Sequence, residues 1–285
     1  MLVRLLCVLM LLYVVVPARA DLIVYESFDY PGTDANGRGL PIVQLAGTGT
    51  GFVSGSKWNV GGRSAFSSNW STTTGSLAYP GLSVANNSVE ALASSAIQGA
   101  YRDTAAAFLR GPSSVNYLSF LIRWTDAAGA LGGFGGIYID GGVSDNADNK
   151  LFIGRSGVSP NWVIENVGGA GQVDSGAASV LDQTALLVLK MEGLEGNDRF
   201  TLFANPTSSV EPLSGAVKTD LDVGTASRLV MYHTGGYQID EIRIGTTFAD
   251  VTPMVAAVPE PSTFALACVA FLLPAGRRFF RRRTA

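Results

Sequence analysis

The feature that most constrains this chain is the brevity of its apolar runs between residue 21 and about residue 252. Short runs rich in Val, Ile, Leu, Tyr and Phe alternate with clusters of Gly, Ser, Asn and Asp, and no window carries an apolar i, i+3, i+4, i+7 stripe for four turns. Glycine in such clusters supplies positive φ at tight turns without steric cost. The expected strands are 22–28, 105–109, 116–124, 134–139, 150–154, 162–166, 185–191, 199–204, 228–232 and 237–245.

Strands at this spacing predict an all-β fold, an antiparallel β-sandwich or barrel. Residues 193–197 (GLEGN) form the expected loop of a hairpin. The best helical candidate, 88–96, is short and poorly capped. We expect 31–75, which is rich in Gly, Ser and Thr, to lie as long loops across the sandwich and to bury its aromatic side chains. These are Phe52, Trp58, Phe66 and Trp70.

The first 20 residues have the parts of a secretory signal peptide. Arg4 supplies the positive start, residues 5–16 form an apolar run too short for a comfortable membrane span, and Ala18 and Ala20 form a small-x-small cleavage site. We therefore expect residues 1–20 to form the apolar signal helix and the mature chain to begin at Asp21.

The last 27 residues form a second sorting segment, joined to the body by a linker at 253–258. Pro259, Glu260 and Pro261 make a stiff non-helical stretch, and an apolar run at 264–275 follows. Twelve helical residues span about 18 Å, against about 30 Å of membrane hydrocarbon. A basic cluster ends the chain and would stay on the cytoplasmic side. It comprises Arg277, Arg278, Arg281, Arg282 and Arg283.

This ending resembles the PEP-CTERM sorting signal of Gram-negative bacteria: a Pro-Glu-Pro motif, a hydrophobic helix and an Arg-rich end at 259–285. The resemblance implies recognition by an exosortase, removal of the tail, and delivery to the cell surface or an exopolysaccharide matrix. The apolar run is short for the family and contains Pro274, which leaves open whether the processed protein stays in the membrane.

The body of the chain is acidic and has no cysteine. Seven of the 20 basic residues but only one of the 23 acidic residues lie in the end segments, which leaves residues 21–258 with a net charge of about −9. Such a charge repels phosphate backbones, so nucleic acid is not an expected partner. Cys7 and Cys268 both lie in the end segments, so the body has no disulfide, thiol nucleophile or thiolate metal site.

The body opens with YESFDYP at 25–31, has a Gly-rich loop with Trp58 and the motif SLAYPGL at 76–82, and closes with DEIRIGTT at 240–247. With these motifs the body, residues 21–252, is similar to secreted concanavalin A-like (laminin-G-like) jelly rolls. This resemblance implies two stacked antiparallel sheets, first and last strands close together, and a concave face that often binds sugar.

Catalytic candidates are few. His233 is the one histidine and has no cysteine partners or Gly-x-Ser-x-Gly elbow, so we expect a structural or surface role. Glycoside hydrolases of this fold carry alternating carboxylates on one strand. The stretch of this sequence closest to that pattern is Asp240-Glu241, whose adjacent side chains should point to opposite faces of the strand. We expect Asp240, in phase with Ile242, to point inward and to cap backbone groups of a neighbouring loop.

Two binding sites are also candidates. The acidic loop 140–149 offers Asp140, Asp145 and Asp148 as oxygen ligands for Ca²⁺, although solvated hairpin residues are the simpler explanation, and the spacing is not that of an EF-hand. Trp162, beside polar Asn161, is the tryptophan most expected to be partly exposed and to stack on a sugar ring.

These features favour an exported surface or matrix protein whose body is a non-catalytic glycan-binding or structural module. The alternative is a secreted carbohydrate-active enzyme. The expected partners are the secretion machinery with its signal peptidase, an exosortase, polysaccharide, and the membrane before processing of the tail.

Deletion of residues 259–285 should mislocalise the protein, because it removes the motif, the apolar run and the basic cluster together. Cell fractionation with surface labelling measures the outcome. Unchanged surface delivery of the truncated chain would contradict the sorting role.

Overall fold

A computed structural model describes residues 22–31, 33–34, 39–60, 67–85, 87–126, 133–140 and 150–254. These residues are strands and connecting loops apart from two short helical turns, η2 (Ile42–Gln44) and α2 (Phe248–Val251). The two sorting segments expected at 1–20 and 259–285 lie outside the described residues, and the compact body ends at Met254. Within the described ranges, no helix is long and apolar enough to cross a membrane.

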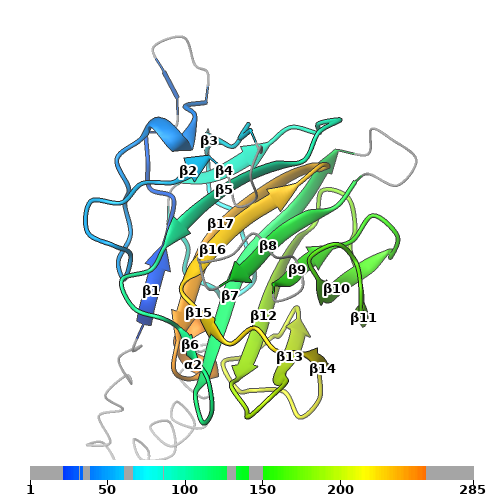
Figure 1. The fold of residues 1–285 in the computed structure, drawn as a ribbon. Helices are drawn as coiled ribbons and strands as arrows, with labels where there is room; N and C mark the ends of the chain where they lie inside the picture. The colour runs from blue at the N-terminus through cyan, green and yellow to red at the C-terminus, as the bar shows by residue number, and fades with distance from the viewer. Residues whose placement is uncertain are drawn as a thin grey trace, which may run out of the picture. The chain divides into compact units, whose positions relative to one another are not determined.

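The strands form two large antiparallel sheets, which confirms the predicted antiparallel sandwich (Figure 1). The eight-stranded sheet runs β14 (Ala216–Leu221), β13 (Asp198–Ala204), β12 (Thr184–Glu192), β7 (Val115–Asp126), β17 (Gly236–Gly245), β4 (Asn87–Ala91) and β3 (Ser71–Thr74), with β1 (Leu22–Glu26) also on β17. The seven-stranded sheet runs β11 (Val173–Ala178), β10 (Asn161–Asn166), β9 (Leu151–Arg155), β8 (Gly135–Asp140), β16 (Arg228–His233), β5 (Gln98–Asp103) and β2 (Asn59–Val60). A small ribbon pairs β15 (Thr225–Ala226) with β6 (Leu109–Arg110).

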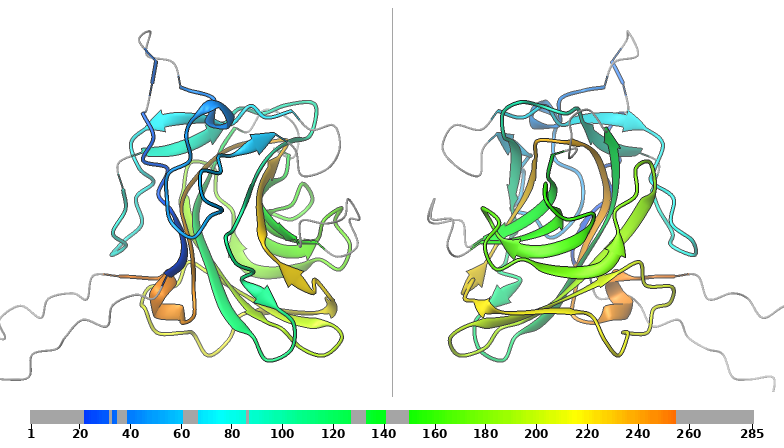
Figure 2. Two further views of the ribbon diagram at one scale, coloured as in Figure 1. Left: turned by 60° about the vertical axis from the view of Figure 1, so that its left-hand side comes forward. Right: turned by 90° about the vertical axis from the view of Figure 1, so that its right-hand side faces the viewer.

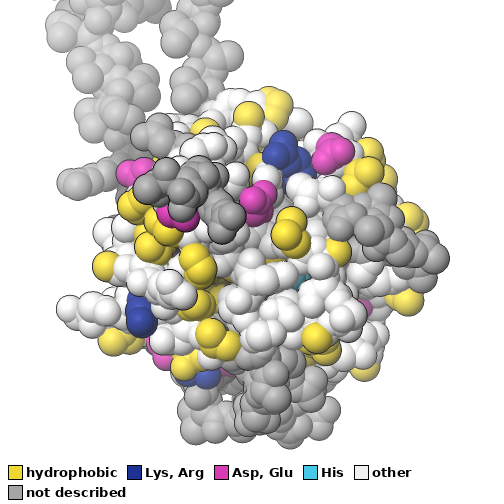
Figure 3. Space-filling model, turned by 90° about the horizontal axis from the view of Figure 1, so that it is seen from above, with side chains coloured by type: hydrophobic (Ala, Val, Ile, Leu, Met, Phe, Trp, Pro, Cys, Tyr) yellow, Lys and Arg dark blue, Asp and Glu magenta, His cyan; other side chains and the backbone are white. Residues whose placement is uncertain are grey.

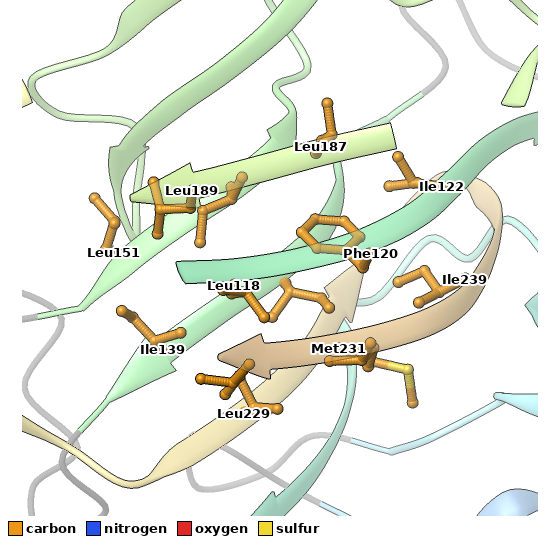
Figure 4. Packing of buried hydrophobic residues seen from close by; sticks show 14 of the residues in the cluster. Leu118, Phe120, Ile122, Ile139, Leu151, Leu187, Leu189, Leu229, Met231 and Ile239 are labelled. Atoms are coloured by element: carbon orange, nitrogen blue, oxygen red, sulfur yellow. The ribbon is translucent and has the colours of Figure 1, made fainter. Parts of the chain in front are cut away.

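The main core lies between the two sheets, which stack as two layers (Figure 2). Because successive strand residues point to opposite faces, every second residue faces this core. Leu118, Phe120 and Ile122 of β7 lie beside Leu187 and Leu189 of β12 (Figure 4). Across from them are the β8 and β16 side chains of the other sheet, including Ile139, Leu229 and Met231.

Each sheet also buries apolar side chains on its outer face. On the eight-stranded sheet, Leu121, Leu186 and Val188 pack with Leu77 and with Phe248 of α2. A second outer cluster lies on the seven-stranded sheet. This two-sided burial explains why the central strands read as nearly continuous apolar runs in the sequence.

The terminal strands lie as expected, whereas the segment 31–75, predicted as loops, also contains η2, β2 and β3. β1 pairs with β17, so the first and last strands of the body are neighbours. Phe52, Trp58 and Trp70 are buried in the main core, which confirms that the loops at 31–75 bury their aromatic side chains; Phe66 lies outside the described residues.

Several assignments from the sequence differ from the structure, which also has strands that the sequence did not predict, among them β5, β11 and β14. The helical candidate at 88–96 contains β4, because Val89 and Ala91 face the core while the strand pairs with both β3 and β17. The weak strand expected at 105–109 is reduced to the short β6 at its end.

A buried ion pair ties β1 to β5 and to the loop between them. Oε2 of Glu26 accepts from Arg102 at 2.5 Å, and also from the Tyr30 hydroxyl and Trp58 Nε1. The other carboxylate oxygen accepts from the Phe28 amide and the Thr48 hydroxyl. Burial raises the pKa of Glu26, while the neighbouring guanidinium lowers it.

Arg102→Met should destabilise the fold by about 3–5 kcal/mol, because it leaves the Glu26 carboxylate buried without its charge partner. Urea unfolding measures the loss. Lys190→Met breaks partly exposed pairs with Glu192 and Glu211 and should cost less than about 1 kcal/mol. Equal small losses for both variants would show that the buried pair does not anchor the fold.

Candidate ligand-binding face

The outer face of the seven-stranded sheet carries three rows of side chains across β5, β16, β8, β9 and β10. The strand registers align these rows. The first row is Asp103, Arg228, Asp140 and Lys150; the second is Tyr101, Val230, Tyr138, Phe152 and Glu165; the third is Gly99, Tyr232, Gly136, Gly154 and Val163.

The first row is a line of alternating charges. Arg228 binds both carboxylate oxygens of Asp103, at 2.7 and 3.2 Å, and its guanidinium lies 4.2 Å from the ring centroid of Tyr101. The Lys150 ammonium lies 3.5 Å from Asp140. Opposite charges on neighbouring strands therefore compensate one another along this edge of the face.

Aromatic rings gather beside this row. The ring centroids of Phe134 and Tyr232 are 4.7 Å apart, and Phe152 meets Phe134 edge to face at 6.2 Å. Tyr138 meets Tyr232 edge to face at 5.3 Å. Rings this close contact one another, so together they form one continuous aromatic surface.

Glycines in the third row keep the space beside Tyr232 clear of side chains. A Cβ on Gly136 would lie 2.1 Å from the carbonyl oxygen of Ile153, and one on Gly154 would lie 2.3 Å from that of Gly135. The backbones of β8 and β9 thus approach too closely here for any other residue. Phe134 and Tyr232 can consequently pack together over this part of the sheet.

These features border a pocket of about 330 Å³. Phe134, Phe152 and Tyr232 line it with Val158 and Glu165, and the turn at 168–169 contributes backbone. Val158 is 78% exposed, whereas Glu165 is 7% exposed. Burial raises the pKa of the Glu165 carboxyl, which accepts a 2.6 Å hydrogen bond from Gln172. We call this the aromatic pocket.

Trp162 does not contribute to this face, which corrects the expectation that it is partly exposed. It is 1% exposed and belongs to the main core, because it shares the inner side of β10 with Ile164. Its neighbours Val163 and Glu165 take the outer side. Trp58 and Trp70 are core residues as well, and Trp124 packs against the core under Arg155.

The calcium candidate is only partly described. Asp140 pairs with the Lys150 ammonium, which already supplies the positive charge that a calcium ion would bring. Asp145 and Asp148 lie outside the described residues. Within the described part of the chain, no three carboxylate, imidazole or thiol side chains gather as a metal site.

His233 is buried between the sheets. Its ring nitrogens lie 2.8 Å from the Gly235 carbonyl oxygen and 2.9 Å from Oδ1 of Asn69, and its ring meets Trp70 edge to face. Burial lowers its pKa to about 4, so the ring is neutral at physiological pH. This is the arrangement of a structural histidine.

Asp240 and Glu241 lie on the outer side of the eight-stranded sheet, where a bulge interrupts the pairing of β17 with β7. The bulge, with φ of 55° at Glu241, breaks the expected alternation, so Asp240 does not point inward. Asp240 accepts from the Ser76 hydroxyl and Leu77 amide, which confirms loop capping; Glu241 accepts from the Ala85 amide and Arg243. Both carboxyls are buried under residues 76–85.

The residues that the sequence did not single out are Phe134, Phe152, Glu165 and Tyr232. Each lies in or beside an expected strand, and each occupies an outward position that alternates with core residues. The sequence signal for these residues was a large or charged side chain at one of the outward-facing positions of each strand. That signal could not be used because the sequence did not show which set of alternate positions faces outward.

No protein family model and no curated protein matches the chain. Among solved structures it is similar to the T. cruzi calreticulin globular domain, at 10% identity and a TM-score of 0.43, over 78% of this chain and 95% of that one. It is similar to the Emp47p carbohydrate recognition domain, at 10% identity and 0.37, over 63% and 89%. A chain described with endo-acting O-glycanases of the human gut microbiota gives 10% identity and 0.44, over 80% and 100%. At such values, function has to be argued from the site itself.

Asp240 should make stability depend on pH. Burial raises its pKa to about 7, so between about pH 4 and pH 7 the folded protein holds a proton that the unfolded chain has released. Its contribution therefore falls as the pH rises towards 7. The unfolding free energy of Asp240→Asn minus that of wild type should therefore increase by about 1–3 kcal/mol as the pH rises from 5 to 8.

Urea unfolding across that pH range measures the difference. Asp29→Asn, at an exposed position, controls for the loss of one negative charge. A wild-type-to-variant difference that stays constant from pH 5 to pH 8 would contradict the assignment.

Proposed function

We propose that the described domain is a non-catalytic glycan-binding module with a concanavalin A-like jelly-roll arrangement, and that its ligand occupies the aromatic pocket. The observation that carries this proposal is the combination of a wall made by Phe134, Phe152 and Tyr232 with one buried acceptor, Glu165. Sugar rings present apolar CH patches and hydroxyl donors, and those are the two kinds of group that this pocket complements.

The size and position of the pocket suit a short section of a glycan. Its volume of about 330 Å³ lies at the lower end of the range for small-ligand pockets. The exposed Val158 gives the wall an open side, where a polymer could extend into solvent. The pocket lies on a sheet, and a rigid support of this kind holds a binding surface without an ordering cost.

The alternative, a carbohydrate-active enzyme, has less support. Glycoside hydrolysis uses two carboxyls about 5–9 Å apart at the scissile bond. Among the described residues that line the aromatic pocket, Glu165 supplies the one carboxyl. Asp240 and Glu241 do lie together, but both are covered and hold loop backbone.

The sorting part of the proposal rests on the sequence. The signal peptide at 1–20 would direct export, with cleavage by signal peptidase, and the Pro-Glu-Pro tail at 259–285 would be recognised by an exosortase. The module would then act at the cell surface or in the extracellular matrix.

On the end of the domain seen in Figure 3, charged side chains are few and hydrophobic ones are scattered among uncharged atoms.

A glycan array followed by polysaccharide pull-down, with and without calcium, tests the binding proposal. Phe134→Ala should weaken binding by about tenfold, because it removes one stacking surface. Val158→Arg should also weaken binding by crowding the mouth of the pocket. Leu213→Arg, at a fully exposed position of the 205–215 loop, is the matched control and should bind normally.

A folded wild-type protein that binds no polymer would refute the glycan-binding role and favour a purely structural surface protein. Equal loss for Val158→Arg and Leu213→Arg would place the ligand elsewhere on the domain.

A further inference from the structure

We infer that the aromatic pocket selects glycan units that carry no negative charge and that donate a hydrogen bond to Glu165. This inference rests on the proposed glycan-binding function and adds to it the class of ligand and the residue that determines specificity. Neutral and amino sugars meet both conditions, whereas uronic acids do not.

Glu165 has one carboxylate oxygen to spare. Its Oε2 accepts from Gln172 Nε2, and within the described chain Oε1 has no hydrogen-bond partner. The residue is 7% exposed and lines the aromatic pocket. Oε1 is not one of the fully buried atoms that lack a partner, so it is open to the pocket, where a ligand hydroxyl or amine can replace water as its hydrogen-bond donor.

The strand register places this acceptor beside an aromatic ring. Glu165 of β10 lies directly across from Phe152 of β9, with Cβ atoms of such pairs about 5 Å apart. A ring whose apolar face packs on the wall therefore directs its edge substituents towards the carboxylate. The donor on the ligand belongs to the same unit that stacks.

The charge around the pocket opposes an anionic ligand. Among the described residues that line the pocket, none is a cation. Lys218 is the charged group that acts on Glu165, but its ammonium binds the Gly171 carbonyl oxygen and Asp220, each at 2.7 Å. A ligand carboxylate would thus approach a buried carboxylate with no cation between them, which disfavours binding strongly where water is scarce.

Affinity measurements on the full chain test this inference against two sets of probes. The neutral set is β-glucan, galactan, mannan and xylan, and the acidic set is polygalacturonate and alginate. Wild type should bind at least one neutral polymer and neither acidic one. Glu165→Ala should weaken the neutral interaction by at least about tenfold, because it removes a charge-assisted hydrogen bond.

Glu165→Gln separates charge from shape. It keeps an acceptor oxygen but removes the negative charge, so it should retain part of the neutral binding and lose discrimination against the acidic probes. Glu195→Gln, at an exposed hairpin position, removes the same charge elsewhere and should leave both unchanged. Thermal unfolding of each variant identifies loss of binding that follows from loss of the fold.

Each outcome decides the matter. Wild-type binding to alginate or polygalacturonate as tightly as to a neutral polymer overturns the inference and leaves the proposed function standing. A folded Glu165→Ala variant whose affinity for the neutral polymer falls by less than about threefold also overturns the inference and leaves the proposed function standing. Failure of the folded wild type to bind any probe overturns both the inference and the proposed function.

Discussion

The alternation of side chains along each strand is the constraint on which the rest of this structure depends. With no cysteine in the body, the fold rests on apolar packing between two antiparallel sheets. Alternation sends half of each strand into that core, as Leu229 and Met231 of β16 show, and commits the other half to an outer face. The aromatic pocket is built from that second half, so Tyr232 is available only because its neighbours are core residues.

Buried charges then attach the long loops to this framework. Glu26 and Arg102 fix the segment that carries Thr48 and Trp58. On the outer side of the eight-stranded sheet, Asp240 and Glu241 hold residues 76–85. Each carboxylate accepts several donors at once, which offsets the desolvation of a buried charge. These two networks hold irregular chain against the sheets.

Much of the fold could be predicted because short runs of neighbouring apolar residues, bounded by turn-forming residues, indicate where strands lie. The apolar runs at 116–124 and 185–191 both lie in central strands, and the pairing of the terminal strands follows the jelly-roll resemblance. The residues of the site were harder to predict from the sequence. Trp162 looked exposed because polar Asn161 precedes it, yet its inward phase puts it in the core. Asp240 was assigned by phase, and the bulge at Glu241 reversed the assignment while leaving its capping role intact.

The sequence by itself determined the all-β class, most strand positions, and the expectation of export and sorting, because these depend on local composition and order along the chain. Only the tertiary structure decided which phase of each strand faces outward and which strands lie side by side. Phe134, Phe152, Glu165 and Tyr232 come from separate segments and meet through the registers of β8, β9, β10 and β16. The physical reason is that a period of two fixes alternation but not direction, since direction is set when one face packs against a second sheet.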